Sequence, residues 1–414
     1  MKKIVILGAG TGGTMMANRL CDSLKHDIDE NKISITIVDE TREHIYQPGL
    51  LFIPFGIYKT KADLIKPREV FLPRDAEFIV SRIQKVDPEK KKVILEKGIL
   101  EYDILIIASG SRIVPEENEG LLGSNWQKTV FDFYTIDGAF KLHRALRSFS
   151  GGTIVINIAE MPIKCPVAPP EITLLTDWYL KERGLRHKTE IIFTTPLSGP
   201  FTKPKAAQKL TQVFEKRNIK IDPEFAYCDL NNENRTLISC DGREHKFDLL
   251  ISIPTMMGAQ FIEDSGLGDE LGWIPTDNHT LQSKEFKDIY IIGDATNVPT
   301  SKAGSVAHFE SEILVENILR HLDGLEPLPK YDGHSNCFIE SGYDKCMLFD
   351  FNYKVEPLPG KFPIPGIGPF TLLGESKMNH YGKMMFRWAY WHLLLRGKDL
   401  PVSPLMSMAG KEVD

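Results

Sequence analysis

The first forty residues constrain the fold of this chain more than any other stretch. Residues Ile4–Leu7 form a continuous apolar run, as a parallel strand buried on both faces requires. The run leads into Gly8-Ala9-Gly10-Thr11-Gly12-Gly13, which fits G-x-G-x-x-G, and residues 14–24 then read as a helix. A second strand, Ile33–Val38, ends at Asp39. A glycine turn between strand and helix, followed by an acid at the end of the next strand, is typical of a dinucleotide-binding βαβ unit.

Each residue type in this unit has a physical role. Gly8 is expected to make the tight turn, Gly10 to let the backbone approach a pyrophosphate, and Gly13 to let the helix pack on the strand. The helix N-terminus offers unpaired N–H groups and the positive end of its dipole to phosphates. Asp39 can accept a ribose hydroxyl. An ordinary glycine-rich turn is the alternative, and the full βαβ context argues against it.

Composition limits the class of protein. A length of 414 residues predicts two or three domains, and a net charge of −6 gives no reason to expect nucleic acid. No apolar run reaches the roughly 18–20 residues of a membrane span. Met1-Lys2-Lys3 resembles the start of a signal peptide, but only four apolar residues follow before the glycine turn, so we expect an intracellular protein. Six cysteines in such a chain indicate redox chemistry rather than a disulfide framework, and we expect no metal.

Two later segments return to the nucleotide-binding domain. Ala108-Ser109-Gly110 follows an apolar strand, and Gly293-Asp294 ends another at the start of a helix. The Asp294 carboxylate can accept the hydroxyls of a flavin's ribityl chain. Lys302 then leads into a helix over residues 305–322, which would aim a cation and a helix N-terminus at the flavin's electron-rich edge. The alternative for Lys302 is a solvated surface lysine.

A second Rossmann-like unit begins near residue 151, but its nucleotide turn is missing. The strand Thr153–Ile158 runs into Ala159-Glu160-Met161-Pro162-Ile163-Lys164-Cys165-Pro166. No glycine remains to admit a pyrophosphate, and the two prolines remove backbone donors. We therefore expect this domain to have lost nicotinamide binding.

Cys165 stands where that turn would be. It neighbours Lys164 and precedes a helix expected over residues 172–183, just past Pro170, and both features favour the reactive thiolate. Glu171 follows within plausible reach for proton transfer. The alternative is a buried structural cysteine. We interpret Cys21, Cys228 and Cys240 as structural.

The third section of the chain starts near residue 324. Cys337 lies on a short strand, and Cys346 follows nine residues later as a competing redox partner. Residues 376–400 combine aromatic and basic side chains, which suits a membrane interface where cations reach the headgroups. An oligomer interface or a helix anchored on the core remains the alternative.

With the segment around Cys165, the chain resembles the sulfide:quinone oxidoreductases, including their flavocytochrome c sulfide dehydrogenase relatives. The resemblance covers nearly the whole chain and rests on the glycine turn, the Lys164-Cys165-Pro166…Glu171 segment, Gly293-Asp294, Lys302-Ala303-Gly304 and Cys337. It implies an α/β fold with two Rossmann-like domains, as in glutathione reductase, and a C-terminal membrane-interacting section. The expected divisions are 1–150 with 262–323, 151–261, and 324–414.

The resemblance also implies the chemistry. FAD would bind the first domain, Cys165 and Cys337 would form the redox pair that turns sulfide into sulfane sulfur or polysulfide, and Glu171 would be the acid/base. A membrane quinone would take the electrons. The protein would be attached peripherally to the cytoplasmic face of the membrane and would form a homo-oligomer. The loop 114–130 lacks the third cysteine of many members, so we expect FAD to be non-covalent. The expected FAD contacts are Gly8, Gly10, Gly13, Asp39, Pro48, Ile83, Ala108, Ser109, Gly110, Gly293, Asp294 and Lys302. The expected quinone contacts are Lys302, Phe351 and Phe362.

Two other classes stay open from the sequence. A type II NADH:quinone dehydrogenase shares the fold and FAD, but needs an intact second glycine turn and has no use for Cys165. A non-catalytic flavin-binding redox sensor would need no quinone site. Adding sulfide or NADH, with and without a quinone, and following the flavin absorbance separates the three.

Overall fold

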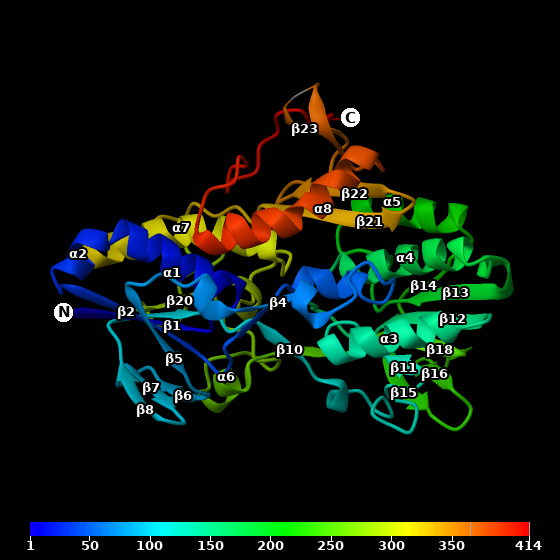
Figure 1. Cartoon of the computed structure of the whole chain (residues 1–414), viewed down its shortest axis with the longest axis horizontal. Coiled ribbons are helices and arrows are strands. Elements are labelled where there is room, and N and C mark those ends of the chain that lie inside the picture. Colours follow the sequence, from blue (N-terminus) through cyan, green and yellow to red (C-terminus); the bar gives the residue numbers. More distant parts are fainter. Residues whose placement is uncertain (365, 414) are drawn as a thin grey trace.

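The computed structural model describes residues 1–364 and 366–413. Its first domain is built on a parallel sheet with the strand order β20-β9-β1-β2-β5 (Figure 1). The strands are β1 (Lys2–Leu7), β2 (Ile33–Asp39), β5 (Ala76–Val80), β9 (Ile104–Ile107) and β20 (Ile289–Ile291). The helices α1 (Thr11–Ser23) and α7 (Gly304–Leu322) pack on one another. Short elements join them: α2 (Lys25–Asp29), β3 (Glu43–Ile45) and β4 (Ile65–Pro67).

Strand β1 shows why the sheet is buried on both faces. Its residues Ile4 and Ile6 enter the core shared with α1 and α7. Val5 and Leu7 point the other way, into a core that includes residues of β6 (Ile83–Asp87), β7 (Lys92–Leu95), β8 (Gly98–Glu101) and α6 (Gln260–Asp264). Alternation along a strand sends successive side chains to opposite faces, so a continuous apolar run fills both cores.

The second domain has its own parallel sheet, in the order β11-β18-β12-β13-β14. These strands are β11 (Val130–Phe131), β12 (Gly152–Ile158), β13 (Thr189–Thr194), β14 (Lys220–Asp222) and β18 (Leu249–Ile253). Its helices are α3 (Ile136–Ser148), α4 (Ala168–Glu182) and α5 (Pro204–Lys216). A small antiparallel sheet adds β15 (Tyr227–Asn231), β16 (Thr236–Ser239) and β17 (Glu244–Lys246), while β10 (Ser111–Ile113) and β19 (Met256–Gly258) pair between the domains (Figure 1). The expected α/β class with two Rossmann-like sheets is confirmed.

The third section forms a four-stranded sheet with the order β21-β22-β24-β23. The strands are β21 (Ser335–Gly342), β22 (Lys345–Phe351), β23 (Gly360–Ile364) and β24 (Gly368–Leu372). Helix α8 (Lys377–His392) crosses from this sheet to the first domain (Figure 1). There the Tyr390 hydroxyl bonds to Thr11 at 2.8 Å and to His44 at 2.6 Å, so the end of α8 is fastened beside the glycine turn. No helix in the described part of the chain is long and apolar enough to cross a bilayer.

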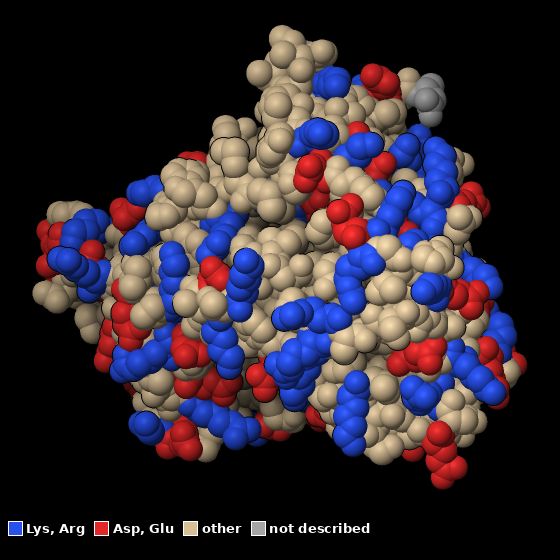
Figure 2. Space-filling view, turned by 45° about the vertical axis from the view of Figure 1, so that its right-hand side comes forward, with Lys and Arg blue, Asp and Glu red and all other residues tan. Residues whose placement is uncertain are grey.

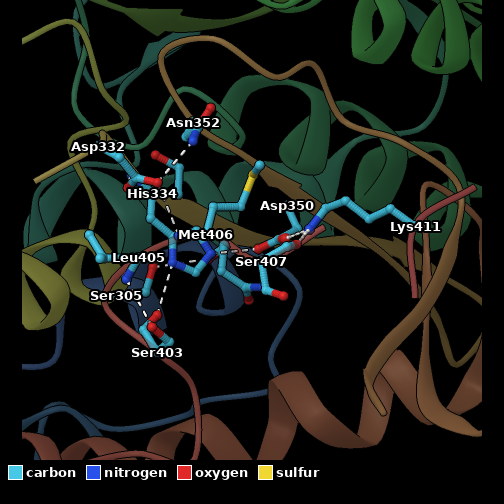
Figure 3. Close-up of polar contacts among 12 residues, drawn as sticks. Ser305, Asp332, His334, Asp350, Asn352, Ser403, Leu405, Met406, Ser407 and Lys411 are labelled. Carbon is cyan, nitrogen blue, oxygen red and sulfur yellow. Dashed lines mark hydrogen bonds and ion pairs between the residues drawn. The ribbon is translucent and has the colours of Figure 1, made fainter. Parts of the chain in front are cut away.

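The C-terminal tail runs back over the third sheet and is held by buried polar groups (Figure 3). His334 Nε2 lies 2.7 Å from Asp350 Oδ1, and the Lys411 ammonium is ion-paired with the same carboxylate. The His334 Nδ1 is 3.0 Å from the Ser403 carbonyl. The Met406 amide donates to Asp332 at 3.1 Å. The tail is therefore part of the folded structure, docked behind the strand that carries Cys337.

Candidate active site

The glycine turn has the geometry that its sequence predicts. Gly8 has a φ of +100°, and a Cβ on it would lie 2.5 Å from the Ala108 carbonyl oxygen. A Cβ on Gly13 would lie 1.8 Å from the Gly8 carbonyl oxygen, so only glycine allows α1 this close to β1. A Cβ on Gly10 would meet nothing within 4 Å. The space beside Gly10, at the start of α1, is therefore open, as a pyrophosphate cradle requires.

Asp39 is held at the rim of this turn. Its carboxylate accepts from the Ala9 amide at 2.8 Å and lies 3.1 Å from the Arg68 guanidinium. Arg68 also donates to the Ala9 carbonyl. Sequence reasoning missed Arg68, because it follows a short strand with no motif around it. The guanidinium fixes the carboxylate at the end of β2, where a ribose hydroxyl would be expected.

The segments after β9 and β20 meet the glycine turn. Ser109, the second residue after β9, buries a hydroxyl that has no partner among the described residues. Gly293 has a φ of +71°, and its amide donates to Glu310 at 2.7 Å. Asp294 accepts a long hydrogen bond, 3.4 Å, from Ser111. An unpartnered buried hydroxyl beside an open cradle fits a polar cofactor at this edge of the sheet.

Lys302 is buried, so its interpretation as a solvated surface lysine is wrong. Its ammonium donates to the carbonyls of Asp294, at 3.2 Å, and Thr296, and lies 4.2 Å from the centre of the Trp273 ring. Burial lowers the pKa of Lys302. The neighbouring Glu310 was missed, and burial raises the pKa of its carboxyl to about 7.

Cys165 and Lys302 are joined through their backbones. The Cys165 amide donates to the Lys302 carbonyl at 2.7 Å, and Cys165 has a φ of +54°. Helix α4 begins at Ala168, four residues earlier than expected, with Pro169 in its first turn. Proline fits there because the first helical N–H groups have no partner in the helix. The cysteine thus lies just before a helix and against the first domain.

The expectation that Lys164 and the helix would lower the pKa of Cys165 is wrong. Burial raises the pKa of this thiol, and Glu171 raises it further. The Lys164 ammonium points elsewhere, with its Nζ 3.5 Å from the Ser111 carbonyl and over the Tyr134 ring. Sequence adjacency to a lysine therefore does not activate this thiol, because the ammonium turns away from it.

Cys337 lies within electrostatic range of Cys165. Cys337 is among the groups that raise the pKa of Cys165, and both side chains pack in the same apolar core. Burial raises the pKa of Cys337 to about 12, and a hydrogen bond with Ser301 opposes that rise. Because Ser301 precedes Lys302, the two cysteines converge on the same two-residue stretch. Both are free thiols.

Cys346 faces the opposite side of its sheet. It pairs across the strands with Glu340, whereas Cys337 pairs with Phe349. Cys337 and Glu340 are three residues apart, so their side chains leave opposite faces of β21. Because Cys346 lies directly across from Glu340, its side chain shares the face of Glu340 and not that of Cys337. The Cys346 sulfur lies 3.2 Å from the carbonyl oxygen of Met347, the next residue, and the side chain is fully buried.

Glu171 links the cysteine region to α8. Its carboxylate accepts from the Glu340 amide at 2.6 Å and is ion-paired with Lys383 of α8. Lys383 also donates to the Phe338 carbonyl at 3.0 Å. Burial raises the pKa of Glu171, and Lys383 opposes this rise. In the sequence Lys383 is only one of the basic residues of 376–400, and no local signal could have paired it with Glu171.

The remaining predicted contacts are spread over the fold. Pro48 lies in the short helix Gln47–Phe52, and Ile83 begins β6. Phe351 is buried at the end of β22 with its ring 6.1 Å from that of Phe201. Phe362 lies on β23, the far edge strand, so β24 separates its strand from that of Phe351.

The other cysteines differ from one another. Cys21 is buried in the core of the first domain, as a structural cysteine would be. Cys228 and Cys240, also interpreted as structural, are both exposed and are not buried structural cysteines.

The glycine turn, the two parallel sheets and the cysteine between them define a flavin-dependent disulphide oxidoreductase. The sequence model of the pyridine nucleotide-disulphide oxidoreductase family matches residues 2–309, and the chain belongs to this family. It is 27% identical over 403 residues to the mitochondrial sulfide:quinone oxidoreductase of Mus musculus, covering 95% of this chain and 86% of that protein. It is 28% identical to the mitochondrial enzyme of the same name from Dictyostelium discoideum, covering 96% and 86%.

A solved structure shares the fold. The X-ray structure of the sulfide:quinone oxidoreductase from Aquifex aeolicus superposes with a TM-score of 0.77 at 20% identity, covering 96% of this chain and 92% of that one. The match extends beyond residue 309 and therefore includes the third section.

Proposed function

We propose that this chain oxidises sulfide to sulfane sulfur or polysulfide with FAD and passes the electrons to a membrane quinone. The observation that carries the proposal is the convergence of Cys165 and Cys337 on Ser301 and Lys302, next to the flavin cradle. Relatives named sulfide:quinone oxidoreductase, similar over 95% or more of the chain, support the reaction.

FAD fits the first domain. Gly10 leaves room for the pyrophosphate, Asp39 stands at the ribose position, and Ser109 offers an unpartnered hydroxyl. FAD, when bound, supplies the two-electron acceptor between the sulfur chemistry and the quinone. The absence of a cysteine from residues 114–130 favours non-covalent binding.

Sulfide chemistry begins with the Cys165–Cys337 pair in its oxidised form. Hydrosulfide attacks the sulfur of Cys165, the S–S bond breaks, and Cys337 leaves as a thiolate. Cys165 then carries the added sulfur as a persulfide. A second hydrosulfide attacks the outer sulfur and takes it as hydrogen disulfide, the shortest polysulfide, leaving the Cys165 thiolate. Closing the Cys165–Cys337 bridge again then releases two electrons per cycle, the pair that FAD would accept. The hydrogen bond between Ser301 and Cys337 stabilises the leaving thiolate.

Glu171 handles protons in this scheme. Burial raises the pKa of the Glu171 carboxyl and so favours the protonated form, which can give a proton, while Lys383 opposes this rise and favours the carboxylate, which can take one. The same ammonium lowers the pKa of both cysteines and so opposes the cost of burying a thiolate. Lys383 is therefore a positioning residue for the acid/base and an electrostatic support for the thiolates.

The quinone would enter from a membrane surface that α8 and the β23–β24 hairpin present. Four large side chains on one stripe of α8 are exposed: Met378, Tyr381, Met385 and Trp388. Ile364 and Ile367 are exposed on the hairpin, whose tip is largely uncharged in Figure 2. The opposite side of α8 carries Lys383 and Tyr390 into the protein. This arrangement supports peripheral attachment to a membrane. Lys302, Phe351 and Phe362 are the proposed quinone contacts.

An NADH:quinone dehydrogenase fits less well. The segment after β12 has no glycine, and Glu160 there binds the Thr255 hydroxyl at 2.9 Å. The hollow beside this segment is lined by Glu117, Glu119 and Glu160 and by no lysine or arginine. Three carboxylates at the carboxyl ends of the strands repel a pyrophosphate.

Anaerobic spectroscopy of the purified holoprotein tests the function. Sulfide should bleach the flavin band, and a quinone added afterwards should restore it. NADH and NADPH should leave the band unchanged. Bleaching by NADH but not by sulfide would reject the proposal in favour of the dehydrogenase.

A further inference from the structure

Two exposed cysteines lie together on the antiparallel sheet of the second domain. Cys228 belongs to β15, and Cys240 directly follows β16. Tyr227 pairs with Ser239 but Asp229 pairs with Ile238, so Cys228 is the extra residue of a β-bulge. A bulge redirects its side chain relative to the regular ladder. Here it brings Cys228 towards the neighbouring strand end.

The contacts of Cys240 establish how close the two residues are. Its amide donates to the Ala226 carbonyl at 2.9 Å, and its sulfur lies 3.4 Å from the carbonyl oxygen of Tyr227. That carbonyl belongs to the peptide bond that leads into Cys228. A hydrogen bond with Cys228 is also the largest cause that raises the pKa of Cys240, so Cys240 keeps its proton to higher pH. The side chains are therefore neighbours across the bulge.

Cys228 also lines a hollow of about 510 Å³. The hollow lies at the carboxyl ends of β12 and β13, where a Rossmann-like domain would bind its nucleotide. Pro196 and Leu197 give it apolar surface, and its charged lining consists of Glu117, Glu119 and Glu160. The hollow therefore suits a small ligand with a positive charge, next to an exposed thiol.

We propose that Cys228 and Cys240 form a second dithiol, which reacts with small disulfides that carry a cationic group bound in this hollow. The Cys228 thiolate attacks the ligand's S–S bond, forming a mixed disulfide and releasing one small thiolate. Cys240 loses its proton, attacks the Cys228 sulfur and releases the second small thiol as the protein disulfide closes. The two cysteines lose two electrons in total, and the ligand disulfide gains them.

This activity is independent of the sulfide reaction. Cys337 is buried and Cys165 is half-buried against the same apolar core, whereas Cys228 and Cys240 are exposed on the sheet β15–β16–β17. A failure of the proposed sulfide chemistry would leave this inference standing, and the reverse also holds.

Peptide mapping of the flavin-containing protein tests the dithiol. After treatment with cystamine, a small dicationic disulfide, and alkylation of the remaining thiols, we expect a peptide linked through Cys228 and Cys240. The variant Cys240→Ser should stop at one cysteamine attached to Cys228, and Cys228→Ser should give no linked peptide. Separate capping of both cysteines in the wild type would overturn the proposal. Cys21→Ser is the control and should behave as the wild type.

The preference for a cationic over an anionic disulfide tests whether the hollow is the binding site. We compare the rate of reaction with cystamine with the rate of reaction with oxidised glutathione, an anionic disulfide. The ratio of these two rates should be at least tenfold higher for the protein than for a cysteine peptide in solution. The double variant Glu117→Gln, Glu119→Gln should lose most of this excess, and so should the wild type in 1 M KCl. A ratio equal to that of the free peptide would overturn the hollow as the binding site.

Discussion

The Lys383 ammonium of α8 is ion-paired with the Glu171 carboxylate in the first turn of α4, across 212 residues of sequence. Both side chains are largely buried, and Glu171 also accepts the Glu340 amide of β21. One ion pair thus connects the second domain, the third sheet and the helix that presents the exposed apolar stripe. Its two charges act in opposite directions on Cys165 and Cys337: Glu171 raises the pKa of both thiols and Lys383 lowers it.

Breaking this pair should cost both stability and activity. Lys383→Met leaves Glu171 buried without its cation, and we expect a loss of about 3–5 kcal/mol in the free energy of unfolding. Sulfide-dependent flavin bleaching should slow strongly, because both thiolates lose a nearby positive charge. Denaturant unfolding and stopped-flow absorbance measure the two effects.

The double variant Glu171→Gln, Lys383→Met is the control for that experiment. It removes both charges, so it should recover much of the stability while the sulfide reaction stays slow. A double variant as unstable as Lys383→Met would contradict a specific pairing of the two residues.

The redox cysteines can be assigned by serine substitution. Cys165→Ser and Cys337→Ser should each retain FAD and lose sulfide-driven flavin bleaching. Cys346→Ser is the matched control, since Cys346 faces the other side of β21 and β22. Near-normal turnover in Cys337→Ser, or its loss in Cys346→Ser with FAD still bound, would reverse the assignment.

The glycine turn gives a prediction that separates cofactor binding from folding. Gly10→Val should yield a folded protein without flavin, because the side chain enters open space that the pyrophosphate would occupy. Gly13→Ala should instead destabilise the fold, since its Cβ would lie 1.8 Å from the Gly8 carbonyl oxygen. Flavin content and circular dichroism distinguish the two effects. A fully yellow Gly10→Val protein would refute the cradle.

The exposed stripe of α8 should govern membrane binding. Replacing Met385 or Trp388, which are 68% and 57% exposed, with aspartate should weaken binding to lipid vesicles by about tenfold or more. Ile99→Asp offers a matched control, because Ile99 is 61% exposed on β8, away from α8. Vesicle co-sedimentation provides the measurement, and equal losses in all three variants would rule out a specific membrane face.

Glu310 should make stability depend on pH. Burial raises the pKa of its carboxyl to about 7 in the folded protein, above its ordinary value of 4.5. The folded state therefore binds more protons than the unfolded state between these values, so stability should fall as pH rises from about 4.5 to 7. Glu310→Gln keeps an acceptor for the Gly293 amide and should flatten this part of the profile. Thermal unfolding from pH 5 to pH 8 would show the difference, and an unchanged slope would contradict it.

The sequence by itself determined the first domain and the missing second nucleotide turn. Strand alternation and the glycine turn are local patterns, because a helix or strand period and a steric need for glycine act over a few residues. They predicted the roles of Gly8, Gly10 and Gly13, which match the observed close contacts and open space. The lack of glycine between β12 and α4 likewise predicted that nicotinamide binding is lost.

Only the tertiary structure decided the electrostatics of the cysteine region. Lys164 adjoins Cys165 in sequence but points away from it, whereas Lys383 reaches Glu171 from a distant helix. The pKa of each thiol depends on burial and on charges brought near by packing, and neither can be read from neighbours in the chain. The same reason explains why Cys228 and Cys240 looked structural in the sequence: their exposure and closeness follow from strand register and a bulge, which only the folded sheet fixes.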